Sequence, residues 1–134
     1  MLKHYTIAAV MTDSAERDKL QFLSESIITT NHSFVRSHGR NAKHRYNYLY
    51  SKEELKPWVD KVKQISLETA VVRGYFNNHY GAKAVINSLQ FKEMLGNSLS
   101  EIEKQSLNHA QEYYRQKGHS SVPGQVTPDD MTNS

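Results

Sequence analysis

The sequence predicts an α/β protein in which short parallel strands alternate with helices. Three short apolar runs have the length of buried strands, and the segments between and after them repeat apolar residues at helical spacing. A serine or aspartate followed three residues later by glutamate marks several expected helix starts. The expected order is β-α-β-α-β-α-α, and strands joined through helices pair in parallel.

The first strand is expected over residues 5–11, an apolar run typical of a strand buried on both faces. Asp13 and Glu16 stand at capping-box spacing, which predicts a helix start. The apolar stripe of this helix would consist of Leu20, Leu23, Ile27 and Ile28. A second short strand is expected around residues 34–36, with polar residues on both sides.

Ser51 and Glu54 form a clearer capping box, and the apolar residues after it recur at helical spacing. The expected buried face is Leu55, Trp58, Val59, Val62 and Ile65. Pro57 lies about one turn inside this helix, so either the first turn is distorted or the helix begins slightly later. A third strand is expected over residues 70–76.

Two further helices are expected after the third strand. One begins near Gly81 and stops at Gly96, because glycine favours helix termination. Its apolar face would be Ala82, Val85, Ile86 and Leu89. The other begins near Ser98 or Ser100, with Glu103 at capping-box spacing. Its apolar face would be Leu99, Ile102, Ala110 and Tyr113.

The chain of 134 residues has the length of one domain and contains no cysteine, which excludes disulfides, thiolate zinc sites and cysteine nucleophiles. No apolar run approaches the roughly 18 residues of a membrane span. The N-terminal apolar patch is too short for a signal peptide, so we expect a cytoplasmic protein. Residues 118–134 are polar, and we expect a disordered tail after a folded domain of residues 1–117.

Positive charge is concentrated in the middle of the chain. All 17 Lys and Arg residues lie within residues 1–117, and the formal net charge of the chain is +3. Residues 32–50 contain basic, histidine and tyrosine side chains but no acid. Such a segment either contacts phosphates or sugar rings, or forms a solvated loop.

Polar side chains follow each expected strand, and ligands of parallel α/β folds bind at the carboxyl ends of strands. Asp13 follows the first strand, and His38 and Arg40 follow the second. Asn77 and Asn78 follow the third strand. We therefore expect these side chains to converge at one edge of the sheet.

An anionic ligand suits these residue types. Arg36 and Arg40 would hold the anion, and His38 would transfer protons near neutral pH. Asn77 and Asn78 would orient the ligand. Each of these residues also has a structural interpretation, as part of a turn at His38 or as a source of hydrogen bonds between loops at the asparagines.

Two further candidates have two interpretations each. Asp13 is either the acid of the site or a helix cap, and its spacing favours the cap. Tyr48, with Tyr46 and Tyr50, either packs over the sheet edge or forms a platform for a sugar or a base. No metal-ligand spacing, dinucleotide motif or phosphate loop occurs, so we expect neither a metal nor a cofactor.

Three ordered segments resemble the YecE-like family, uncharacterised TIM-barrel proteins named for a domain of unknown function. They are residues 34–41 (FVRSHGRN), 46–55 (YNYLYSKEEL) and 76–79 (FNNH), with Gly81, Ala84 and Asn87 after them. Family members typically have arginine and a large apolar residue before His-Gly-Arg, then Tyr-x-Tyr-x-Tyr-Ser with Glu-Glu-Leu, and then Phe-Asn-Asn before the final barrel helix. The likeness covers roughly residues 5–96, and it departs at Ser37 and Ser88.

The resemblance implies the C-terminal part of a TIM (β/α)₈ barrel, with the three strands similar to its sixth, seventh and eighth. A full barrel needs about 250 residues. Residues 1–117 would then form about three βα units with flanking helices and an extra C-terminal helix. Open sheet edges are expected in such a partial barrel, and a protein partner or a second copy would complete it.

Two hypotheses about function remain open. The first is a barrel-mouth site that binds a phosphate, sugar-phosphate or nucleic-acid ligand and performs hydrolase-type acid–base chemistry. The second is a non-catalytic partial barrel or subunit that acts only through association with another protein. Nucleic-acid binding through residues 32–50 is a third and weaker interpretation.

Overall fold

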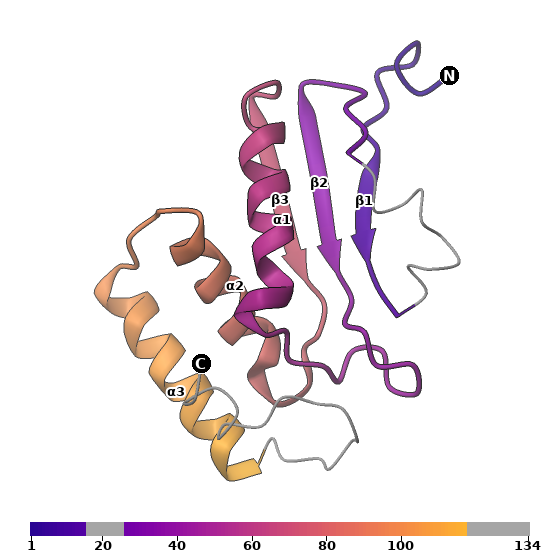
Figure 1. Cartoon of the computed structure of the whole chain (residues 1–134). Coiled ribbons are helices and arrows are strands. Elements are labelled where there is room, and N and C mark those ends of the chain that lie inside the picture. The colour runs from indigo at the N-terminus through magenta and orange to yellow at the C-terminus, as the bar shows by residue number, and fades with distance from the viewer. Residues whose placement is uncertain (16–25, 118–134) are drawn as a thin grey trace.

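A computed structural model describes residues 1–15 and 26–117 of the chain (Figure 1). A three-stranded parallel sheet runs in the order β1 (Val10–Asp13), β2 (His32–Ser37) and β3 (Val71–Phe76). Asp13 pairs with Ser37, and Ser37 pairs with Phe76, so all three strands end at the same edge. The predicted α/β class with parallel strands is confirmed.

Helix α1 (Lys52–Ile65) begins at the predicted capping box. The Ser51 hydroxyl accepts the Glu54 N–H, and the Glu54 carboxylate accepts the Ser51 N–H. Pro57 lies inside the helix without delaying its start. The predicted face is buried and packs against Met11 and Val35 of the sheet. Helix α1 therefore covers one face of the sheet (Figure 1).

The opposite face of the sheet is called the open face here, and it carries Val10, Phe34, Arg36, Arg73 and Tyr75. Side chains alternate along β2, so Ser33, Val35 and Ser37 are buried on the α1 side. On the open face, Phe34 is half-buried and Arg36 is exposed. Tyr75 pairs with Arg36 and is 48% exposed. Within the described ranges, no helix packs over this face (Figure 1).

Two further helices lie beside the sheet and α1. A 3-10 turn (Tyr80–Ala82) leads into α2 (Lys83–Met94), and α3 (Glu101–Lys117) packs on α2. The predicted cap of α3 is confirmed, because Ser100 and Glu103 exchange side-chain to backbone hydrogen bonds. A second apolar cluster joins these helices to the loop before α1. Its buried members are Leu49, Ile86, Ala110 and Tyr114.

The first predicted strand is wrong in position. Strand β1 starts at Val10, because only residues 10–13 lie alongside β2, and Tyr5 and Ile7 are exposed. Ile27 and Ile28 lie outside any helix. The rest of the helix predicted after Asp13, with Leu20 and Leu23, falls outside the described residues, as does the tail of residues 118–134.

The predicted buried faces of the last two helices are partly wrong. In α2, Val85 is exposed, and the buried positions include the polar residues Lys83, Asn87 and Gln90. Hydrogen bonds satisfy these polar groups, so apolar spacing alone misplaced the face. In α3, Ile102 and Tyr113 are exposed, and the buried ring is Tyr114.

No helix in residues 1–15 or 26–117 combines the length and the apolar character that a membrane span needs.

We predict that Ile65→Ala lowers the free energy of unfolding by about 2–5 kcal/mol, because it leaves a cavity in the core between α1 and the sheet. Ile65 is 1% exposed, whereas Leu67, two residues later, is 86% exposed. Leu67→Ala is therefore the matched control, with an expected change within about 0.5 kcal/mol. Urea unfolding measures both variants, and equal losses would contradict the assignment of the core.

Candidate functional site

Arg40, in the loop after β2, joins the end of β1 to the start of α1. Its guanidinium donates Nε and Nη2 to the two carboxylate oxygens of Asp13, at 2.9 and 3.0 Å. Its Nη1 donates to Glu54 at 3.2 Å, and the Tyr48 hydroxyl donates to the same oxygen of Glu54. We call Asp13, Arg40, Glu54 and Tyr48 the ionic network.

Tyr50 lies against this network. Its ring centroid is 5.6 Å from the Arg40 guanidinium carbon, and its hydroxyl accepts the Gly39 N–H at 2.8 Å. Burial and the Asp13 carboxylate raise the pKa of Tyr50, while burial and Glu54 raise the pKa of Tyr48. Both phenols therefore stay neutral at physiological pH.

Gly39 allows the loop after β2 to fold back on itself. Its φ of +94° is in the left-handed region, and a Cβ there would collide with the backbone carbonyl of Arg45. The space beside Gly39 is therefore occupied by the backbone of the same loop, at Arg45.

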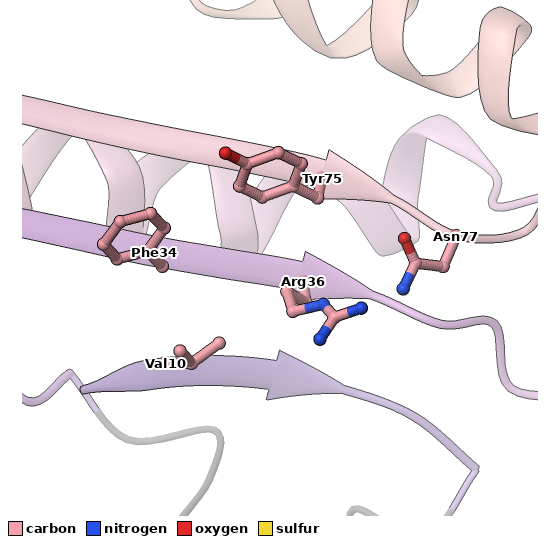
Figure 2. Close-up of a pocket in the computed structure, with 5 residues that line it drawn as sticks. All are labelled: Val10, Phe34, Arg36, Tyr75 and Asn77. Carbon is pink, nitrogen blue, oxygen red and sulfur yellow. The ribbon is translucent and has the colours of Figure 1, made fainter. Parts of the chain in front are cut away.

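A second group of polar side chains lies on the open face, at the ends of β2 and β3. The Asn77 amide nitrogen lies 3.1 Å from Nδ1 of His38. Arg36 and Asn77 line a hollow of about 330 Å³, together with Val10, Phe34 and Tyr75 (Figure 2). With the amide nitrogen as donor, Nδ1 accepts and the neutral ring carries its proton on Nε2.

His38 resists protonation. Burial lowers its pKa below the ordinary value of 6.5, and the nearby cations Arg36 and Arg45 lower it further, while Asp13 opposes them. The ring is consequently neutral at pH 7 and suited to hydrogen bonding or to proton exchange with a ligand.

The three tyrosines predicted to act together are divided. Tyr46 is exposed, and its ring centroid lies 6.0 Å from that of His38 and 5.6 Å from that of His79. Tyr48 and Tyr50 pack against each other at 5.1 Å, on the α1 side of the loop. Of these three tyrosines, Tyr46 is the one that lies beside His38 and His79.

Asn78 has a structural position. It is fully buried, and its amide donates to the Tyr48 carbonyl and to Asn87 Oδ1, both at 2.8 Å. Asn87 in turn bonds the backbone N–H and carbonyl of Tyr50. These two asparagines hold the segment that supplies the tyrosines.

The predicted site residues therefore separate into two groups. The structure brings Arg36, His38 and Asn77 together on the open face. Asp13 and Arg40 pair with each other in the ionic network, to which Tyr48 also belongs. Asn78 is buried. Two residues important here were missed as site residues: Glu54, which the sequence marked only as a cap, and Asn87, which entered only through the family resemblance.

Metal binding has no support in the side chains described. No three His, Asp or Glu side chains within residues 1–15 and 26–117 are grouped so that they could hold a metal ion.

The fold and the site define an α/β protein with a parallel sheet and a polar group at the carboxyl ends of its strands. A family model described as "Protein of unknown function DUF72" matches residues 1–112. The chain belongs to this family, which is the YecE-like family, so the resemblance found in the sequence is confirmed.

Two solved structures are similar to the chain. A DUF72 family protein from Thermotoga maritima is 32% identical, with a TM-score of 0.57 over 72% of this chain. A DUF72 family protein from Enterococcus faecalis V583 is 24% identical, with a TM-score of 0.61 over 74% of this chain, and that likeness concerns the fold alone. The chain spans 39% and 40% of the lengths of those two proteins. No curated protein matches the chain.

We predict that the two arginines differ sharply in their effect on stability. Arg40→Ala leaves the Asp13 carboxylate, which is 2% exposed, without its partner and should cost about 3–5 kcal/mol. Arg36→Ala, on an exposed side chain, should change the free energy of unfolding by no more than about 0.5 kcal/mol. Chemical denaturation measures both, and similar losses would show that the ionic network does not hold the loop.

We predict that the His38 ring titrates below pH 6.5 in an NMR titration. Arg36→Gln should raise the pKa of His38 by removing a repulsive charge, whereas Arg73→Gln, farther along the sheet, should leave it unchanged. The unfolded chain binds this proton more readily than the folded one, so the contribution of His38 to stability falls as the pH drops below about 6.5. A midpoint at or above 6.5 would contradict the assigned environment.

Proposed function

We propose that the chain forms about three consecutive βα units of a TIM (β/α)₈ barrel, with the open face turned toward the barrel interior. The parallel order β1-β2-β3, with α1 on the opposite face, supports this arrangement. In such a barrel, His38 and Asn77 lie at the mouth, where the strands end.

We propose that this mouth binds a phosphate-containing anion, whether a free phosphate, a sugar phosphate or a nucleic-acid phosphate. The observation that supports this is that Arg36 and Asn77 line one hollow and that His38 lies against Asn77. Arg36 is exposed and supplies the cation, and Asn77 supplies an amide. Arg40 is assigned to the loop instead, because Asp13 and Glu54 occupy its donors.

His38 is assigned the acid–base role of a hydrolase-type reaction in this proposal. The lowered pKa keeps its ring neutral, and the contact with Asn77 fixes the orientation of the ring. The Nε2 proton is then the one available to a ligand oxygen, and a neutral imidazole is able to polarise such an oxygen.

A second candidate is association with another protein, which the open face favours. Val10 and Tyr75 are large apolar side chains exposed on this face, at 42% and 48%. Partner chains commonly cover exposed apolar surface of this kind. If this were the function, Tyr75→Ala would abolish association seen by sedimentation velocity, and phosphate would have no effect on it.

We predict that the purified chain binds inorganic phosphate and that Arg36→Gln weakens this binding about tenfold or more, because a charge-assisted hydrogen bond is lost. His38→Ala should weaken it less. Arg115→Gln, which removes the same charge from an exposed position on α3, is the matched control and should have no effect. Titration followed by NMR measures the affinities. Equal losses of affinity at positions 36 and 115 would show that phosphate responds to the overall positive charge of the chain and not to a specific site at Arg36.

A further inference from the structure

The hollow on the open face has two unlike ends. Arg36 and Asn77 lie toward the carboxyl ends of β2 and β3, while Phe34 and Val10 lie farther from those ends (Figure 2). The volume of about 330 Å³ is within the range of small-molecule sites, about 300–1,000 Å³. A phosphate alone would occupy the polar end and leave the aromatic end empty.

The aromatic end presents ring surface to solvent. The rings of Phe34 and Tyr75 are nearly parallel, at an interplanar angle of 9° and a centroid distance of 6.4 Å. Tyr75 is 48% exposed. Exposed aromatic faces of this kind bind planar rings by stacking.

The positive charge of the open face favours a negatively charged ligand. Arg36 and Arg73 both belong to it, and the Arg73 guanidinium carbon lies 5.9 Å from the Phe34 ring centroid. The three strands contribute no carboxylate to this face, because Asp13 is buried on the α1 side. A negatively charged occupant is therefore favoured.

We propose that the ligand of this site is a nucleoside monophosphate or a compound of the same chemical class, with a planar aromatic ring and a phosphate. The ring lies on the aromatic side chains Phe34 and Tyr75, and the phosphate lies at the strand ends beside Arg36 and His38. This inference rests on the proposed anion site and adds the ring to it.

The test compares adenosine 5′-monophosphate with ribose 5-phosphate, which has the phosphate but no base. Isothermal titration of the whole chain should show adenosine 5′-monophosphate binding about tenfold tighter, from stacking of the base. Tyr75→Ala should lower the affinity for adenosine 5′-monophosphate toward that of ribose 5-phosphate, because only Phe34 then contacts the base, and it should leave ribose 5-phosphate binding unchanged. Tyr113→Ala, an equally exposed tyrosine on α3, is the matched control and should change neither.

The possible failures are distinguishable. Equal affinities in the unmodified chain would overturn the ring subsite and leave the anion site standing. Binding of neither phosphate compound would overturn both. Binding of a single-stranded oligonucleotide without binding of the monophosphate would overturn the monomeric ligand in favour of a polymer. Tyr75→Leu, which keeps apolar bulk without a ring, should behave as Tyr75→Ala does, and it replaces that variant if the alanine chain fails to fold.

Discussion

The contact between Arg40 and Asp13 is the constraint on which the candidate site depends. A carboxylate that is 2% exposed needs a charged partner, and Arg40 supplies it from the loop after β2. The backbone adds to this, because the His38 N–H donates to the Asp13 carbonyl at 2.9 Å. Since Arg40 also reaches Glu54, one side chain fixes the loop against both a strand end and a helix start.

The two arginines near the strand ends have separate roles as a result. Arg40 has its donors occupied inside the protein, whereas Arg36 points to the open face and lines its hollow. A protein that used a single arginine for both roles would lose its loop whenever the ligand pulled that arginine away. In the proposed site, the loop geometry would not depend on the ligand, because Arg40 keeps its contacts with Asp13 and Glu54.

The sequence predicted β2, β3 and α1 well, because apolar runs and helical spacing depend on neighbouring residues, whereas β1 begins only at Val10. The sequence predicted that Asp13 and Arg40 meet at one edge of the sheet, but it did not predict that they pair with each other and with Glu54. Side chains alternate between the two faces of the sheet along β2, which places Arg36 on the face opposite the buried Ser37. The strand ends at Ser37, so this alternation does not predict the position of Arg40. In α2 the predicted face was partly wrong because Lys83, Asn87 and Gln90 are buried, and in α3 Tyr114 is buried in place of Ile102 and Tyr113.

The segment between β2 and α1 is held from both directions along the chain. Asp13 lies before it, while Asn78 and Asn87 follow it, 30 and 37 positions from the residues they bond. Contacts of such long sequence separation cost chain entropy, because they close a long loop of the chain. In a chain emerging from the ribosome, Tyr50 gains its two hydrogen bonds with Asn87 only after much of α2 has been synthesised.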